Sequence, residues 1–395
     1  MIDTQTTEEA VDVYTRWNEL EKQLTTQWGT GEDIIDFDLL QPRKVPEFKS
    51  RFQVLEKLED LYDRVEPTTN EEQFIKAKLN ASIYFIRALM GELIPFPEYM
   101  KNLTGVSPQL IPEEVVQKQK ELMYAHMKDL GYKPESEPFE EFYKRIIISK
   151  EEALRQMETV KTTVPPLVQK VLDFDYLVID HEIKKVEVDD FWGSWSSKKP
   201  GEPFLLRFNF HPTKQWRNGD IRRLALHEYV HFIHGQNLMN GIVKLQINPF
   251  IGITTVHDPH TFSAEGTANT ILHLPEVEQG FSKYELLSRD RVITQHYLTN
   301  NAIIFANEGK NQDQILDYFS DFPFLTKKLV IDSIARWKKP SRKVYECVYG
   351  ISHYTHRQLL DRLPPEKQKE FLRYELTTYE MPERLIEFAN SLFLD

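Results

Sequence analysis

The stretch IRRLALHEYVHFIHGQ (221–236) carries the pattern that decides the fold around it. Its apolar residues recur at helical spacing, and it contains no Gly or Pro from Ile221 to His234, which predicts a buried helix. At 3.6 residues per turn, His227 and His231 project from the same face of that helix and can share one metal ion. The stretch therefore predicts a metal-binding helix.

Glu228 completes an HExxH pattern between the two histidines. On a helix, this glutamate is held beside the metal, where it can take a proton from zinc-bound water. A half-exposed helix whose histidines only hydrogen-bond to their neighbours is the alternative. A buried helix with three histidines and a glutamate needs a reason, however, because unpaired polar groups are costly in a core. The pattern favours a zinc enzyme that hydrolyses amide bonds.

A catalytic zinc ion usually takes three protein ligands and keeps one position for water. Metzincins have a histidine six residues after the second motif histidine, where this chain has Asn237, so that class is excluded. Gluzincins use a glutamate from a later helix, and Glu265 in HDPHTFSAEGTANTILHL (257–274) is the candidate. Small neighbouring residues would let its helix pack closely on the first. Asn269 could then hydrogen-bond a ligating histidine.

Three other histidines compete with Glu265 as the third ligand. His234 shares the motif helix, but its spacing of seven from His227 would require a bent geometry. His257 and His260 fit better as residues that line a cleft or cap the next helix, and Asp258 fits as its N-cap. These alternatives remain open from the sequence.

The bulk composition limits the class of protein. A chain of 395 residues exceeds a single core and predicts either one large lobed domain or two domains. A net charge of −12 without a basic block argues against nucleic acid as a partner. The single cysteine, Cys347, excludes an internal disulfide. Without an apolar leader or a long apolar run, we expect a cytoplasmic protein with no membrane partner.

Residues 1–172 are expected to form a helical N-terminal lobe that walls the cleft, and residues 173–395 a catalytic lobe. Apolar residues at three-to-four spacing predict helices in the first lobe. The predicted helices run from Glu8 to Trp28, Glu47 to Arg64, Asn70 to Met90, Glu113 to Leu130 and Lys150 to Leu172. Pro- and Gly-rich segments separate them.

The segment 174–212 is richer in Val, Ile and aromatic residues, which predicts strands. A turn is expected near His181, a polar loop at GSWSSKKPGEP (193–203), and a half-buried strand over 204–210. We therefore expect a mainly α (α+β) fold with a small antiparallel sheet beside the HExxH helix and a deep substrate cleft. Strand 204–210 is a candidate edge that adds a peptide substrate as a further strand. Its alternative is a purely structural hairpin.

Several segments together resemble a known group of enzymes. They are RFNFHP (207–212), LALHEYVHFIHGQ (224–236), SAEGTAN (263–269) and VYGISHYTHRQLL (348–360), with weaker likeness at 103–123 and 288–300. The chain resembles the mostly helical gluzincins, including thimet-type oligopeptidases and HExxH metallocarboxypeptidases. It is most similar to a bacterial family of uncharacterised, predicted zinc peptidases. That family commonly has a Pro-Gly variant inside its metal motif, whereas this chain has the plain HExxH.

The resemblance implies one zinc ion per chain, a peptide substrate and a Tyr or His from a later helix that stabilises the oxyanion. Tyr349, followed by Gly350, matches the family's tyrosine–glycine segment, and His353 one turn later is the second candidate. An aromatic core stripe would explain these residues equally well. Arg357 could bind a substrate carboxylate, but an arginine at a helix surface is usually just solvated.

Two other functions remain alternatives to a peptidase that acts as a carboxypeptidase or an oligopeptidase. One is a non-catalytic peptide-binding or regulatory protein that keeps a structural zinc, closed by a fourth ligand such as His257. The other is a zinc hydrolase of a small amide or ester. Glu228 favours an enzyme, because a structural site has no need of it.

Overall fold

The computed structural model describes residues 3–24, 34–44, 46–190 and 192–394. About 64% of it is helical, and a small five-stranded sheet makes up most of the rest of the regular structure. The predicted mainly α (α+β) class is therefore confirmed.

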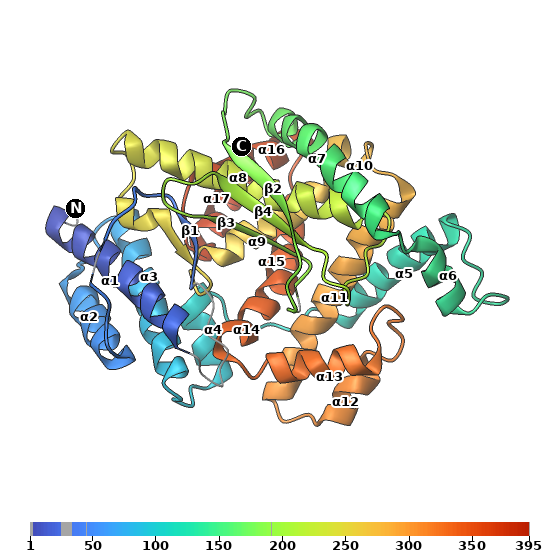
Figure 1. The fold of residues 1–395 in the computed structure, drawn as a ribbon, viewed down its shortest axis with the longest axis horizontal. Coiled ribbons are helices and arrows are strands. Elements are labelled where there is room, and N and C mark those ends of the chain that lie inside the picture. The colour runs from blue at the N-terminus through green and yellow to red at the C-terminus, as the bar shows by residue number, and fades with distance from the viewer. Residues whose placement is uncertain (1–2, 25–33, 45, 191, 395) are drawn as a thin grey trace.

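The first part of the chain folds into the five expected helices and two further short ones, over 96–104 and 139–146, and all of them lie at the blue to green end of the chain in Figure 1. Their bounds are α1 (Thr4–Gln23), α2 (Arg51–Arg64), α3 (Asn70–Leu89), α4 (Phe96–Thr104), α5 (Glu113–Asp129), α6 (Phe139–Ile146) and α7 (Lys150–Val171). The end predicted for the first helix, at Trp28, lies outside the described residues. Side-chain caps fix three of the other starts, with Ser50 before α2, a Thr69–Glu72 capping box at α3 and Ser149 before α7.

The sheet has the strand order β2-β4-β3-β1-β5. Its strands are β1 (Ile35–Asp38), β2 (His181–Val186), β3 (Ser194–Lys198), β4 (Phe204–Asn209) and β5 (Ile253–Thr255). β4 pairs in parallel with β2 and antiparallel with β3, and β1 pairs in parallel with β3 and antiparallel with β5. The sheet is therefore mixed, and the prediction of an antiparallel sheet was wrong in this respect.

Two details of the strand prediction also change. The expected turn near His181 is instead the start of β2, and the expected loop at 193–203 contains β3. β4 lies inside the sheet, between β2 and β3, so both of its edges are already hydrogen-bonded. Strand 204–210 is thus not an edge that could accept a substrate strand.

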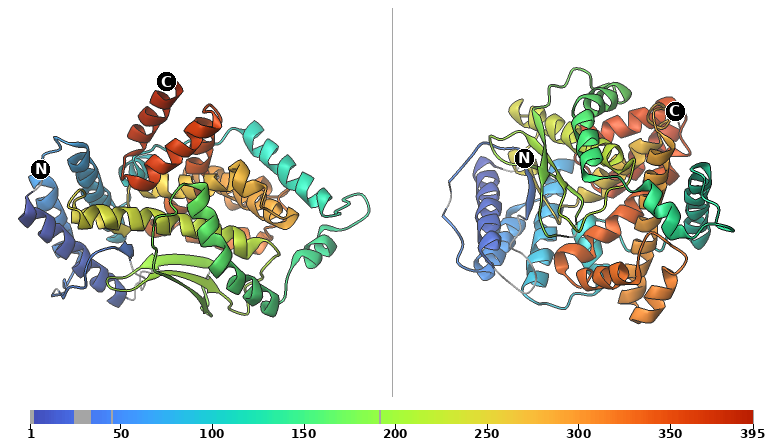
Figure 2. Two further views of the ribbon diagram at one scale, coloured as in Figure 1. Left: turned by 90° about the horizontal axis from the view of Figure 1, so that it is seen from above. Right: turned by 45° about the vertical axis from the view of Figure 1, so that its right-hand side comes forward.

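The remaining helices follow the sheet strands along the chain. They are α8 (Asp220–Val243), α9 (Thr261–Thr270), α10 (Pro275–Glu278), α11 (Lys283–Asn307), α12 (Gln312–Tyr318), α13 (Lys327–Arg336), α14 (Pro340–Lys343), α15 (Tyr345–Leu360), α16 (Pro365–Thr377) and α17 (Pro382–Leu394), with short 3₁₀ turns η1 (Pro249–Gly252) and η2 (Ile271–His273). α8 contacts the sheet, α7, α9, α11 and α16. Figure 2 shows the strands on one side of α8 and the red C-terminal helices on the other.

Buried apolar side chains form two clusters. One joins α1 to α6 with β5, α11, α13 and α15, and the other joins α7 with β4, α8, α9, α16 and α17. Both clusters draw residues from either side of residue 172, and α7 packs on α8 rather than only on the N-terminal helices. The division of the chain at residue 172 stays a prediction.

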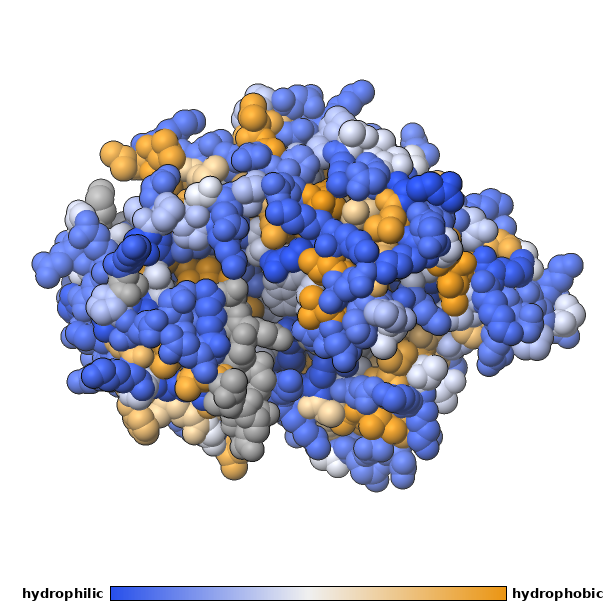
Figure 3. All heavy atoms as spheres, in the orientation of Figure 1, coloured by the Kyte–Doolittle hydropathy of each residue, from blue (hydrophilic) through white to orange (hydrophobic). Residues whose placement is uncertain are grey.

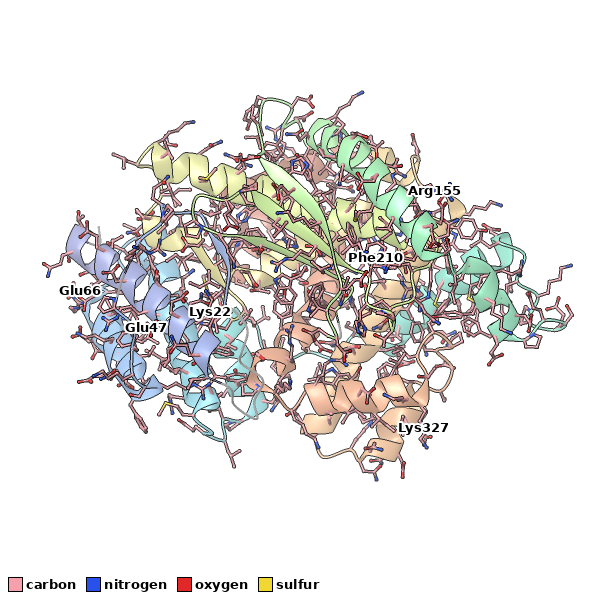
Figure 4. All side chains as sticks on the ribbon, in the orientation of Figure 1. Lys22, Glu47, Glu66, Arg155, Phe210 and Lys327 are labelled. Carbon is pink, nitrogen blue, oxygen red and sulfur yellow. The ribbon has the colours of Figure 1, made fainter. Side chains whose placement is uncertain are left out.

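The surface differs from this interior. Hydrophilic residues cover most of the face in Figure 3, and apolar residues are scattered among them. Phe210, which follows β4, is buried at the end of the sheet (Figure 4), with its ring 5.6 Å from that of Trp216. Among the described helices, none combines the length and the apolar character needed to cross a bilayer.

Candidate metal centre

α8 presents the motif histidines toward a small cavity between the sheet, α9 and α15. The Nε2 atoms of His227 and His231 lie 3.4 Å apart, and their rings meet edge-on. Both histidines are largely buried, as expected for residues on the inner face of a core helix. Helical periodicity alone produces this convergence, because residues four apart lie one above the other.

Glu265, on α9, joins the two histidines. Its Oε2 atom lies 3.3 Å from His227 Nε2 and 3.9 Å from His231 Nε2. A tetrahedral zinc ion bound at its usual distances to nitrogen and oxygen separates its ligand atoms by about 3.3 Å. Two of the observed separations, 3.3 and 3.4 Å, match that arrangement, and the third, 3.9 Å, is about 0.6 Å longer.

The hydrogen bonds of Glu265 also fit a ligand. Tyr345 donates to its Oε1 at 3.2 Å, whereas its Oε2 is buried and has no hydrogen-bond partner among the described residues. A buried carboxylate oxygen without a donor is costly unless a cation meets it. The donor set of two imidazoles and one carboxylate therefore suits zinc.

Glu228 lies beside the same centre but has a different partner. One ligand atom from each of His227, Glu228 and His231 lies within 4.8 Å of the others. Ser194, from β3, donates to Glu228 Oε1 at 3.1 Å. Glu265 Oε2 therefore fits better as the third ligand, and Glu228 fits better as a base.

Burial sets the protonation of the centre. It lowers the pKa of His227 and of His231 to about 4, because a charged imidazole is poorly solvated there. Both rings are thus neutral near pH 7, which is the form that binds metals. Burial also raises the pKa of Glu228, a direction that suits a general base working near neutral pH.

Tyr349, the first oxyanion candidate from the sequence, reaches the cavity from α15. It lines the cavity with Tyr345, and the two rings lie 5.3 Å apart. Gly350 makes this position possible, since a Cβ there would lie 2.6 Å from the carbonyl oxygen of His296 on α11. The close approach of α15 to α11 stacks the Tyr349 ring on His296 with a centroid distance of 4.8 Å.

The structure does not bring His353 to the cavity. Its Nδ1 pairs with the Tyr297 hydroxyl at 2.9 Å and its Nε2 with His273 at 3.2 Å. One helical turn beyond Tyr349, the ring faces the packed interior. Arg357 pairs with Asp361 on its own helix and does not line the cavity either. The second oxyanion candidate and the suggested carboxylate ligand are therefore misplaced.

Asn269 lies one turn after Glu265 on α9. Its side-chain amide donates to the backbone carbonyl of Glu265 at 2.9 Å, which ties the ligand's own turn together. The Asn269 side chain also partly counters the lowering of the pKa that burial imposes on His227. It is therefore placed to influence both ligands.

Two of the three rival histidines lie away from the cavity. His234 pairs with the carbonyl of Thr378, and His257 pairs with Ser82 and stacks on Phe85. His260 lines the cavity; its ring stacks on His234 and its Nδ1 pairs with the Ser263 hydroxyl, whereas its Nε2 is buried without a hydrogen-bond partner among the described residues.

Asp258 does not cap α9. Its Oδ1 accepts from the backbone amide of His260, and its Oδ2 pairs with the buried Lys78 of α3. The loop before α9 is thus tied to the N-terminal helices through this ion pair.

The cavity holds about 80 Å³ and opens beside a larger hollow of about 590 Å³. Asp36 and Trp195 line both spaces, and Lys22 of α1 (Figure 4) lines the larger one. β1 and β3, two walls of the site, were not predicted from the sequence. The alternation Ser194-Trp195-Ser196 indicated a strand, but the nearby Lys-Lys-Pro-Gly run favoured a loop.

Comparison with known proteins supports the fold. A structure described as "the putative lipoprotein from Colwellia psychrerythraea" matches with a TM-score of 0.59 and 14% identity, over 86% of this chain and 66% of that one. Another, "a putative lipoprotein of unknown function from Shewanella oneidensis", gives a TM-score of 0.46 and 13% identity, over 87% and 71%. No family model and no curated protein matches the chain. The chain thus shares a fold with the first protein and spans just under two thirds of its length.

Proposed function

We propose that this protein is a zinc-dependent peptidase of the gluzincin type. The observation that carries the proposal is the convergence of His227 Nε2, His231 Nε2 and Glu265 Oε2 within 3.3 to 3.9 Å, with a fourth group, Glu228, beside them. Three ligands leave one position for water, and the extra carboxylate is what hydrolysis requires.

The proposed mechanism assigns a role to each side chain. Zinc held by these ligands would lower the pKa of a water molecule and polarise a carbonyl group. Glu228, oriented through Oε1 by Ser194, accepts the proton of the attacking water and passes it to the leaving amine. Tyr349, half-buried at the cavity wall, donates a hydrogen bond to the oxyanion of the substrate.

An extended peptide would bind along β3. Within the described part of the chain, β3 pairs with β4 over its whole length but with β1 only at Lys198. Ser194, Trp195 and Ser196 line the cavity on the side toward β1. The backbone of β3 from Ser194 to Ser196, which forms no bridge to β1 among the described residues, would hydrogen-bond a peptide without selecting its sequence. The larger hollow past Trp195 would accommodate the rest of an oligopeptide.

A non-catalytic zinc protein would need a different arrangement. Its structural site would be closed by a fourth protein ligand, and His257 was the candidate from the sequence. His257 instead pairs with Ser82 and is not among the residues that line the cavity, so it does not supply this fourth ligand, which favours the enzyme. A hydrolase of a small amide or ester would use the same centre, so only the products distinguish it from a peptidase.

The test combines metal content with product analysis. Protein purified in the presence of zinc should contain about one zinc per chain. It should produce a ladder of fragments from a mixed peptide library, detected by mass spectrometry, whose order shows the end from which cleavage proceeds. Glu228→Gln should keep the metal and lose the fragments. Zinc-free protein that cannot be reconstituted would refute the proposal.

A further inference from the structure

A buried cluster lies behind the metal ligands, on residues that do not line the cavity. Glu375 on α16 pairs through Oε1 with His356 Nε2 on α15 at 2.7 Å, and both side chains are about 1% exposed. Its Oε2 accepts from the Thr267 hydroxyl on α9, also at 2.7 Å. One carboxylate therefore joins three helices, including the helix that carries Glu265.

The hydrogen bonds around His356 define its protonation. Its Nδ1 lies 2.7 Å from the carbonyl oxygen of Ser352, which can only accept, so this nitrogen carries a hydrogen. The other nitrogen faces Glu375, whose second oxygen already accepts from Thr267. If His356 is an imidazolium and Glu375 a carboxylate, both ring nitrogens donate a hydrogen bond and both carboxylate oxygens accept one. Removal of either partner would leave a charge buried without its partner.

The His356 ring also packs directly on the backbone of α9. A Cβ at Gly266 would lie 2.1 Å from Cε1 of the ring, so only glycine leaves room for it. Gly266 and Thr267 are the two residues that follow Glu265. The ring and the carboxylate thus fix the turn of α9 from which the Glu265 side chain extends.

We propose that His356 and Glu375 are positioning residues that hold Glu265 at the distance where its carboxylate meets His227 and His231. The proposal rests on the proposed function of the site as a metal centre. The distances from Glu265 Oε2 to the two Nε2 atoms, 3.3 and 3.9 Å, lie within about 0.6 Å of those in a tetrahedral zinc site, so a further shift of α9 by about 1 Å would take the carboxylate out of range.

Zinc affinity, measured by competition with a chromophoric chelator, provides the first test. Glu375→Ala should weaken zinc binding by about 10–100-fold, the usual effect of removing a group that orients a ligand. Glu375→Gln should stay within about threefold of the natural protein, because an amide of the same shape can accept from Thr267 and donate to a neutral His356. Glu370→Ala, at an exposed position of the same helix, is the matched control.

A second comparison separates positioning from a general loss of structure. In a Glu265→Gln background, Glu375→Ala should change zinc affinity by less than about threefold, because the ligand through which it acts is already impaired. An equal loss in both backgrounds would overturn the proposal, as would a Glu375→Ala protein with unchanged affinity. If Glu375→Ala does not fold, Thr267→Val removes one contact of the carboxylate, and its loss of affinity should likewise depend on Glu265.

Hydrogen exchange of the metal-free protein tests the same idea without zinc. Glu375→Ala should speed exchange of the α9 amides (261–270), while those of α2 stay as in the natural protein. Unchanged α9 exchange would overturn the proposal. If the natural protein binds no zinc, the proposed function fails, and this measurement alone decides whether the pair holds α9.

Discussion

Gly266→Ala should destabilise the protein, although glycine-to-alanine changes inside helices usually stabilise by about 1 kcal/mol. The new Cβ would lie 2.1 Å from Cε1, 2.2 Å from Nδ1 and 2.6 Å from Nε2 of His356. The ring cannot yield while it is bound on both sides at 2.7 Å, to Ser352 and to Glu375. Breaking a buried ion pair costs about 3–5 kcal/mol, so we expect a net loss of about 2–4 kcal/mol.

Urea unfolding followed by circular dichroism measures this change. The matched control is the same substitution in a His356→Ala background, where the ring is absent and Gly266→Ala should cost less than about 1 kcal/mol. A single Gly266→Ala variant within about 1 kcal/mol of the natural protein would refute the reasoning. So would an equal cost in both backgrounds, because the clash with the ring would then not be its cause.

Buried polar contacts give three further predictions. Lys78→Met should cost about 3–5 kcal/mol in urea unfolding, because it leaves Asp258 buried without its partner. Ser194→Ala should lower the rate of peptide cleavage about 10–100-fold at unchanged zinc content, because it removes a hydrogen bond to Glu228, the proposed base. Burial lowers the pKa of His356, but the charge and hydrogen bond of its carboxylate partner outweigh it and raise the pKa overall. Protonated His356 therefore stabilises the folded protein fully below about pH 6.5, and this contribution is lost as the pH rises through the raised pKa of His356. The difference in free energy of unfolding between the natural protein and His356→Gln should therefore shrink in urea titrations at alkaline pH.

Each of these predictions has a result that contradicts it. An exposed ion pair should contribute less to stability than the buried pair of Lys78 with Asp258. Lys57→Met, which breaks a surface contact to Glu9, should therefore change the free energy of unfolding by less than about 1 kcal/mol. Equal effects at positions 57 and 78 would show that burial is not the cause. Ser391→Ala, which removes an exposed serine hydroxyl on α17 away from the cavity, should leave cleavage unchanged. If the natural protein instead became more stable relative to His356→Gln as the pH rises, the pKa of His356 would be lowered in the folded protein and not raised.

Local sequence patterns predicted where several helices begin and that the two histidines of the motif share one helix face. The helices α3, α5 and α7 begin at the predicted residues, Asn70, Glu113 and Lys150, because caps and apolar periodicity are properties of neighbouring residues. The mixed sheet could not be predicted, since parallel pairing of β2 with β4 and the insertion of β1 depend on residues far apart in the chain. The prediction of His353 as an oxyanion candidate was wrong for a similar reason, because helical spacing does not say which face of the helix packs against the interior.

The sequence by itself determined that His227 and His231 share one helix face with Glu228 beside them, because a helix repeats every 3.6 residues. Small residues around Glu265 also indicated a helix able to approach closely. Only the tertiary structure decided which groups complete the site. Ser194 lies on strand β3, and Tyr345 and Tyr349 lie on the late helix α15. The pair of His356 with Glu375 packs against α9 on the side away from the cavity. The contact of Glu375 with Thr267 joins residues 108 positions apart, and packing of the whole chain, rather than any local pattern, brings such segments together.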